Sequence, residues 1–332
     1  MTRDPFGSLK DGRPVERITL ENDAIRASII TLGATLQDLR MAGCDRPLTL
    51  GSNTVTDYED GGDLHYFGAI VGPVANRIYK ARTVFDGREL QFDANGLGGH
   101  VLHGGAAGLH HKLWQVEEAT QTRVLLSATA EDGEGGFPGN RRFEAEFVLE
   151  GAGLTLKLRA ETDAPTLMNL ANHSYWNLGD KDDFHGHQLQ IDADTYLPCD
   201  DTDIATGEIR DVAGTEMDFR IARALTSDDV IDNNFCLSEQ RVPLRQVGSL
   251  TGPDGVRLGI ETTEPGLQIY DTRHLPAEGV PGHDGKVYRP RAGVAIEAQF
   301  WPDAPTHPTF PAIRMEPGEA WEQTTRFTFS QG

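Results

Sequence analysis

Apolar and polar residues alternate with a period of two along much of this chain, the pattern of β-strands that bury one face. Apolar side chains occupy alternate positions from Phe143 to Leu149 and again from Leu154 to Ala160. The sequence Gly-Ala-Gly at 151–153 separates the two runs and suits a turn. The two runs therefore predict an antiparallel hairpin.

Turn signals between other strand-like runs extend this picture. Asp-Gly pairs, which favour tight hairpin turns, stand within residues 85–88 and 253–256, and residues 326–329 predict a last strand. Helical periodicity is confined to short pieces such as residues 54–60. Many strands without intervening helices cannot form a parallel sheet, so we predict one all-β domain over residues 1–332, a large antiparallel β-sandwich with few short helices.

Charge and cysteine content narrow the class of partner. The 332 residues include 30 Lys and Arg against 51 Asp and Glu, a net charge of -21. Such a charge repels nucleic acid, anionic membranes and phosphorylated substrates, so a neutral small molecule is favoured. Three scattered cysteines and a polar N-terminal segment suggest neither a disulfide framework nor a secretion signal, and we expect a cytoplasmic protein.

A polar cluster interrupts the strand pattern at residues 171–178, Ala-Asn-His-Ser-Tyr-Trp-Asn-Leu. A strand that only buries one face needs no imidazole, amides, hydroxyls and indole side by side. His173 alone is compatible with an ordinary core histidine whose ring nitrogens bond to the backbone. A catalytic role for His173 therefore depends on which other groups lie near it.

Four further positions carry groups suited to chemistry. Arg77, beside Asn76, ends a run rich in apolar residues and glycine, where a guanidinium needs an acceptor. His103 precedes two glycines, which allow close approach of a ligand. Glu297 lies among apolar neighbours, and if it is buried its pKa rises and it becomes a candidate acid or base. Asp232, judged from its spacing, favours a turn-capping role.

Metal binding is the main rival use for the histidines. His110 and His111 are adjacent, and His185 and His187 would point the same way on a strand. Neither pair has an obvious carboxylate or cysteine set that completes a site, so we expect no metal and no cofactor.

Motifs along nearly the whole chain resemble those of the aldose 1-epimerase, or galactose mutarotase, family. They are TLGATLQDL, VANRI, FDGRELQF, VLHGG, NHSYWNL, DNNFCL, TTEPGLQIY and IEAQFWPDAPTHPTFPAI, in family order. The resemblance implies a β-sandwich of galactose mutarotase type. It also implies an enzyme that interconverts the α and β anomers of free aldoses such as galactose or glucose without a cofactor.

The resemblance also implies roles for individual residues. Glu297 would be the catalytic base and His173 the acid, and the predicted sugar-binding residues are Asn76, Arg77, His103, Asp232 and Gln268. Tyr175 or Trp176 would stack on the apolar face of a pyranose. Because an ionised Glu297 and a protonated His173 favour each other's charge, we expect both to be charged in the resting site.

Three departures from the family motifs bear on substrate preference. Pro73 stands where an arginine is common, Asn233 stands where a histidine is common, and Asp271–Leu275 replaces the usual segment after Gln268. Two alternatives stay open: a hexose-6-phosphate 1-epimerase, with Lys80 and Arg82 near the substrate motif, or a carbohydrate-binding protein without turnover. The preferred aldose, the pathway and the oligomeric state are not predicted.

Overall fold

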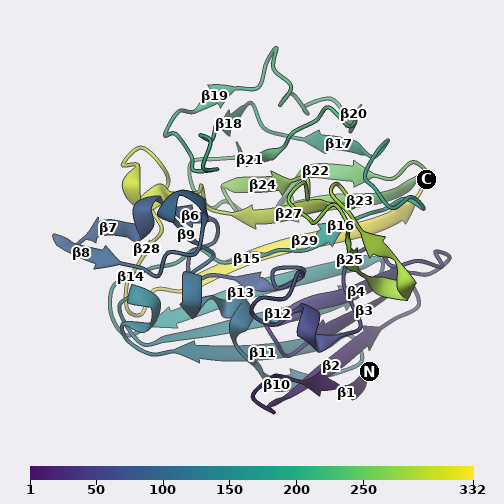
Figure 1. Cartoon of the computed structure of the whole chain (residues 1–332), viewed down its shortest axis with the longest axis horizontal. Coiled ribbons are helices and arrows are strands. Elements are labelled where there is room, and N and C mark those ends of the chain that lie inside the picture. The colour runs from purple at the N-terminus through teal and green to yellow at the C-terminus, as the bar shows by residue number, and fades with distance from the viewer.

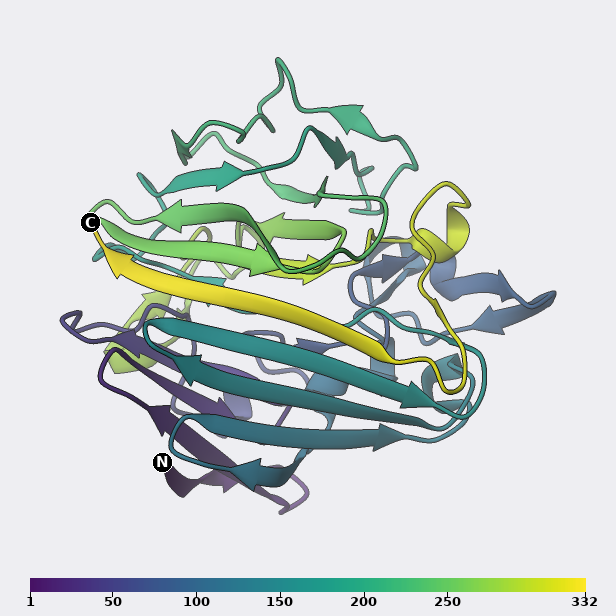
Figure 2. The same cartoon turned by 180° about the vertical axis from the view of Figure 1, so that it is seen from behind.

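Antiparallel strands make up most of the structure, a computed structural model that describes residues 1–332 (Figure 1). Its largest sheet has nine strands and forms the rear of the molecule, as Figure 2 shows. In spatial order the strands are β10 (Gln115–Ala119), β11 (Arg123–Ala130), β12 (Arg141–Glu150), β13 (Gly153–Thr162), β29 (Trp321–Gln331), β23 (Val256–Thr262), β22 (Arg245–Thr251), β17 (Gln188–Ile191) and β20 (Arg223–Ala224).

Two smaller sheets lie in front of this large sheet in the view of Figure 1. One has six strands in the order β16 (Tyr175–Trp176), β27 (Val294–Gln299), β24 (Gly266–Tyr270), β21 (Asp232–Cys236), β18 (Thr195–Leu197) and β19 (Arg210–Asp211). The other has four strands: β1 (Thr2–Ser8), β2 (Pro14–Glu21), β3 (Ile25–Ile30) and β4 (Thr35–Met41).

Short strand pairs and single helical turns complete the chain. The pairs are β15 (Ala171–Asn172) with β5 (Ile70–Val71), β6 (Arg77–Ile78) with β9 (Val101–Leu102), β7 (Arg82–Phe85) with β8 (Arg88–Gln91), β14 (Thr166–Leu167) with β28 (Arg314–Met315), and β25 (Val280–Pro281) with β26 (Val287–Tyr288). The 3-10 helices are η1 (Val55–Asp57), η2 (Tyr79–Ala81), η3 (Leu97–Gly99), η4 (Gly105–Ala107), η5 (Leu109–His111), η6 (Glu134–Gly136), η7 (His283–Gly285) and η8 (Ala304–Thr306). Each of these helices has three residues, far too few to span a bilayer.

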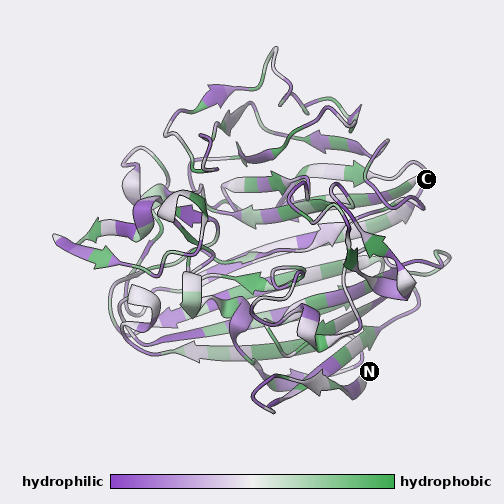
Figure 3. Ribbon diagram, viewed as in Figure 1, coloured by the Kyte–Doolittle hydropathy of each residue, from purple (hydrophilic) through white to green (hydrophobic).

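The main hydrophobic core holds 54 buried residues and lies between the sheets. Phe147 and Phe327 of the large sheet belong to the same cluster as Ile296 of the six-stranded sheet and Leu39 of the four-stranded sheet. Figure 3 shows the alternation of hydrophobic and hydrophilic residues along the long strands. The predicted all-β sandwich architecture is therefore confirmed.

The predicted hairpins are present. Leu149 of β12 lies opposite Leu154 of β13, and residues 252–255 connect β22 to β23. Asp86 and Gly87 form the two-residue turn that joins β7 to β8. Their φ values are 51° and 73°, and this type of hairpin turn needs positive φ at both positions. The last strand, β29, includes residues 326–329.

Two expectations of local structure need correction. The helix expected at residues 54–60 is only the single turn η1. It does not continue because the following N–H groups form turn hydrogen bonds: the Gly62 N–H donates to the Glu59 carbonyl, and the Leu64 N–H donates to the Asp57 carbonyl. The strand expected at 171–178 is broken after Asn172. Its first part pairs with β5 and its second with β27, which leaves His173 between two ladders.

Candidate active site

A pocket of about 240 Å³ opens beside the six-stranded sheet and brings together residues far apart in the chain. Its walls come from β6, β9, β16, β21, β24 and β27 and from the loops around residues 63–67 and 272–275. The lining residues are Asp63, Tyr66, Phe67, Asn76, Arg77, Leu102, His103, His173, Tyr175, Asp232, Tyr270, Thr272, His274, Leu275 and Glu297. This size suits a ligand smaller than a typical drug molecule.

His173 is held by its backbone in the gap between β15 and β16. Its N–H donates to the Ala69 carbonyl and its own carbonyl accepts from the Gly68 N–H, both at 2.9 Å. The imidazole stacks on the ring of Tyr175 with centroids 4.9 Å apart, and Tyr66 lies almost parallel to it at 5.9 Å. These contacts orient a buried imidazole whose Nδ1 has no hydrogen-bond partner.

Glu297 is buried on β27, where the strand ladder places it opposite Gln268 of β24. Its Oε1 lies 3.4 Å from Nε2 of His173, and its Oε2 has no hydrogen-bond partner. The carboxyl group and the imidazole therefore face each other in the pocket wall. No strand periodicity could have established this contact, since the residues are 124 positions apart.

Burial controls the protonation of this pair. It raises the pKa of Glu297 well above its ordinary value, and the nearby Asp232 carboxylate raises it further. Burial also lowers the pKa of His173 to about 3. Both shifts favour the neutral forms. The expectation that both groups are charged in the resting site is therefore wrong, because desolvation outweighs their mutual attraction.

The neutral pair and the charged pair hold the same number of protons. A neutral carboxyl with a neutral imidazole holds one dissociable proton, and so does a carboxylate with an imidazolium. The two forms differ only by transfer of that proton between Oε1 of Glu297 and Nε2 of His173.

His103 and Asn76 are joined by two reciprocal hydrogen bonds. The Asn76 N–H donates to Nδ1 of His103 at 3.1 Å, and the His103 N–H donates to the Asn76 carbonyl at 3.0 Å. Both residues have positive φ, 62° and 51°, which turns their amides toward each other. Because Nδ1 accepts a hydrogen bond, the neutral His103 ring carries its proton on Nε2 and is a donor to the pocket.

Asp232 and Gln268 form a second linked pair on adjacent strands. Nε2 of Gln268 donates to Oδ1 of Asp232 at 2.6 Å. Asp232 lines the pocket, while Gln268 is buried behind it. Burial raises the pKa of Asp232, and the guanidinium groups of Arg77 and Arg273 oppose this rise. Asp232 lies on a strand, and its side chain caps no turn.

The two aromatic residues of the polar cluster have different positions. Tyr175 lines the pocket, where it stacks on His173 and on Phe67. Trp176 points the opposite way, as successive strand residues do, and packs in the main core against Phe327 and Phe329. The expectation that Trp176 could stack on a sugar is therefore wrong. Tyr66, which the sequence did not single out, supplies another aromatic wall.

Ligand atoms of His103, His173 and Glu297 lie within 4.8 Å of one another, a set that resembles a metal site. The bond from Asn76 argues against coordination by His103, because its pocket-facing Nε2 carries the proton. His187 does not ligate a metal with His185, since its Nδ1 donates to the Phe184 carbonyl and its Nε2 accepts from the Leu178 N–H.

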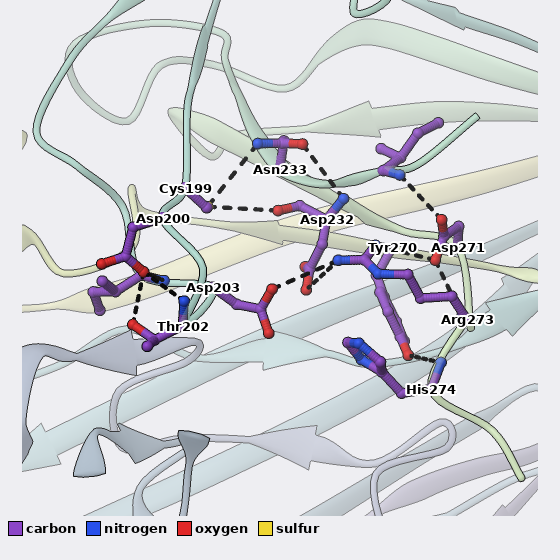
Figure 4. Close-up of polar contacts among 12 residues, drawn as sticks. Cys199, Asp200, Thr202, Asp203, Asp232, Asn233, Tyr270, Asp271, Arg273 and His274 are labelled. Carbon is purple, nitrogen blue, oxygen red and sulfur yellow. Dashed lines mark hydrogen bonds and ion pairs between the residues drawn. The ribbon is translucent and has the colours of Figure 1, made fainter. Parts of the chain in front are cut away.

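A network of charged groups joins Asp232 of the pocket wall to Arg273 and Asp203 (Figure 4). Arg77 contacts Asp203 at 3.3 Å, and Arg273 lies 3.6 Å from Asp203 and 3.8 Å from Asp232. Sequence reasoning missed Asp203, because the acidic run 200–203 looks like a solvated loop. The one sequence feature that could have pointed to Asp203 is the presence of three aspartates within these four residues, which is more than a turn requires.

Two of the three departures from the family motifs, Asn233 and Pro73, do not line the pocket. Asn233 points away from the pocket and donates from Nδ2 to the Leu197 carbonyl at 2.9 Å. Pro73 accepts from the Asn169 N–H through its carbonyl. Of the three departures, only the segment 271–275 therefore contributes side chains to the wall, through Thr272, His274 and Leu275.

Comparisons with known proteins agree with this architecture. The family model for aldose 1-epimerase matches residues 16–328. Galactose mutarotase of Rattus norvegicus is 36% identical over 342 aligned positions, covering 99% of this chain and 98% of the relative. Aldose 1-epimerase of Escherichia coli K12 is 33% identical, with 96% of each chain covered.

Solved structures give the same result. The GalM/aldose epimerase homologue from C. elegans superposes with a TM-score of 0.88 at 30% identity, covering 95% of this chain and 98% of the other. Galactose 1-epimerase from Lactobacillus acidophilus superposes with a TM-score of 0.84 at 28% identity, covering 100% and 98%. The chain described here belongs to the aldose 1-epimerase family.

Proposed function

We propose that Glu297 and His173 catalyse the anomer interconversion of aldoses, the reaction to which family membership assigns this enzyme. The observation that carries the proposal is their contact of 3.4 Å in a pocket of about 240 Å³. The substrate class that this pocket favours is a free monosaccharide.

Mutarotation needs one group that accepts a proton and one that donates a proton at the same time. Opening the ring removes the proton of the C1 hydroxyl and adds a proton to the ring oxygen, while the C1–O5 bond breaks. Rotation about the C1–C2 bond then presents the other face of the aldehyde, and closure reverses both transfers. The reaction is not a redox reaction, and each proton that leaves the sugar or is added to it is exchanged with Glu297 or His173.

The single proton of the pair fits this cycle. In the charged form, the Glu297 carboxylate takes the C1 proton while the His173 imidazolium donates to the ring oxygen. Ring opening then leaves both groups neutral, the form that burial favours in the empty pocket. Hydroxyl groups of a bound sugar would donate to the carboxylate and offset its desolvation.

Other pocket residues would orient the sugar. The Nε2–H group of His103 and the guanidinium of Arg77 offer donors, Asp232 offers an acceptor, and Asn76 and Gln268 support these groups. The rings of Tyr175 and Tyr66 offer apolar surface to a pyranose face. A binding protein without turnover would need the donors, the acceptor and the rings, but it would not need Glu297 beside His173.

Charge supports a free sugar over a sugar phosphate. Arg77 is the one Lys or Arg side chain that lines the pocket, against the carboxyl groups of Asp63, Asp232 and Glu297. A phosphate usually needs several cations around it. The expected cation Lys80 instead donates to the Gly98 carbonyl.

Polarimetry of freshly dissolved anomers tests the proposal. Pure α-galactose or α-glucose should reach anomeric equilibrium faster with the protein present, and a chelator should not slow this reaction. Glucose 6-phosphate provides the matched comparison, and faster turnover of the phosphate would overturn the substrate class. Activity lost in chelator and restored by a divalent ion would overturn the cofactor-free mechanism.

A further inference from the structure

Arg273 belongs to the segment that departs from the family motif, and its guanidinium extends toward Asp203 and Asp232 (Figure 4). The segment is anchored at three points. The Tyr270 hydroxyl accepts from the His274 N–H, the Asp271 carboxylate accepts from the Ile231 N–H, and the Thr272 hydroxyl donates to the Gly293 carbonyl. The side chain of Arg273 therefore extends from a fixed support.

The guanidinium of Arg273 has unused hydrogen-bonding capacity. Its one hydrogen bond runs from Nη1 to Oδ1 of Asp271 at 3.2 Å, although a guanidinium has five N–H donors. The Nη2 group lies 3.6 Å from Oδ1 of Asp203 and 3.8 Å from Oδ2 of Asp232. Both distances are too long for good direct hydrogen bonds, so an oxygen that lies beside the pair could bond to the guanidinium and to a carboxylate together.

A sugar hydroxyl has the chemistry that such a gap requires. It accepts a hydrogen bond from a guanidinium through its oxygen and donates its own proton to a carboxylate. Asp232 forms part of the pocket wall, so the gap adjoins the space that a bound sugar would occupy. Three carboxylates, of Asp203, Asp232 and Asp271, lie around the two guanidinium groups of Arg77 and Arg273, and this excess of negative charge disfavours an anionic substituent at the same place.

We propose that Arg273 is a specificity-determining residue whose guanidinium, together with the Asp232 carboxylate, binds one hydroxyl of the sugar away from the reacting carbon. This inference rests on the proposed function and adds a residue that the family motifs do not supply. Asp203 is a positioning residue, because it lies between the guanidinium groups of Arg77 and Arg273.

The test combines one substitution with a set of deoxy sugars. The Arg273→Gln variant and the unmodified enzyme would be assayed by polarimetry with galactose and with its 2-, 3-, 4- and 6-deoxy analogues. Removing a hydrogen bond to a charged group should raise the KM for galactose roughly 10- to 100-fold, with kcat nearly unchanged. For one deoxy analogue the substitution should change KM less than about twofold, because that sugar lacks the hydroxyl that Arg273 binds.

Two further variants control the interpretation. Arg273→Lys keeps the charge but loses the planar fork, so it should raise the KM for galactose less than Arg273→Gln does. Arg210→Gln removes an exposed arginine that is paired with Glu208, and it should leave every KM unchanged. Urea unfolding of each variant separates weaker binding from a loss of folded protein.

Two results would overturn the inference. One is a KM for galactose that Arg273→Gln leaves unchanged, and the other is an equal rise for galactose and all four deoxy sugars, which indicates a purely structural role. The proposed function fails separately, if the unmodified enzyme does not accelerate mutarotation of any of these sugars.

Discussion

Glu264 and Glu297 are both buried glutamates, yet their surroundings differ in the group that faces the carboxylate. Glu264 accepts two hydrogen bonds from the guanidinium of Arg241, at 2.6 and 3.0 Å, and a third from the Thr263 hydroxyl. Arg241 in turn packs on the rings of Trp321 and Phe300. Glu297 has no cation beside it, only the neutral His173 and an Oε2 without a partner.

The difference shows how one residue type can serve two purposes. A buried carboxylate that is fully paired contributes to the fold, and its oxygens are already occupied by hydrogen bonds. A buried carboxyl without a cation keeps a high proton affinity, which a catalytic base needs. The histidines repeat this contrast, since both ring nitrogens of His187 are hydrogen-bonded, whereas Nδ1 of His173 is free.

The largest expected effect is the loss of turnover in Glu297→Gln. The amide keeps the volume and one acceptor oxygen but cannot accept a proton, so kcat should fall by roughly 10²- to 10⁴-fold. The free energy of unfolding should change little, because burial already favours the uncharged carboxyl. Polarimetry and urea unfolding measure the two quantities. A raised KM with unchanged kcat would show that Glu297 only binds sugar.

A smaller loss is expected for His173→Asn. The amide keeps a donor but cannot cycle a proton, and kcat should fall by roughly 10²- to 10³-fold. Some turnover should remain, because the Nε2–H group of the nearby His103 can support the ring oxygen. The double variant with Glu297→Gln should be little slower than Glu297→Gln alone, since the two residues act as a unit. Losses that multiply would contradict the paired mechanism.

The opposite result is expected for Glu264→Gln. This change leaves the Arg241 guanidinium without its carboxylate, and breaking a buried pair is strongly destabilising. Because the Arg241 side chain is 24% exposed, we expect a loss of about 2–3 kcal/mol in the free energy of unfolding, below the usual range for a fully buried pair. The kcat of the folded fraction should be unchanged. A stable but inactive variant would remove the contrast between the two glutamates.

Much of the fold was accessible from sequence, because alternation and Asp-Gly turns are local signals. They predicted the hairpin of β12 and β13 and the turn at Asp86. The same alternation could not show which face of β16 meets the pocket, and this is why Trp176 was misplaced.

We propose that the chain forms one domain, since a single core cluster includes residues from Ile18 to Phe329.

The residues of the candidate site were accessible from family motifs, but the electrostatics of the pocket were not. The motifs marked His173 and Glu297, yet their protonation depends on burial, which no motif records. Asp203 and Arg273 were missed as partners because their contact joins two loops about 70 residues apart. A polar loop in a sequence carries no signal of what it will face.

The smallest expected effect concerns the acid limb of the pH profile. A pair with ordinary pKa values would gain its second proton near 4.5, the usual pKa of a glutamate. Here that proton must go to an imidazole whose pKa is lowered to about 3. The one-proton form therefore persists at lower pH, and kcat at saturating galactose should stay within about twofold of its plateau at pH 4. The ratio kcat/KM is not the measure here, because it also reports protonation of Asp232, whose pKa is raised by burial. Glu264→Gln provides the control, because its site pair is intact and its profile should match that of the unmodified enzyme. An acid limb centred at or above pH 4.5, in protein that circular dichroism shows to be folded, would mean that solvent reaches the Glu297 carboxyl and that burial does not set its proton affinity.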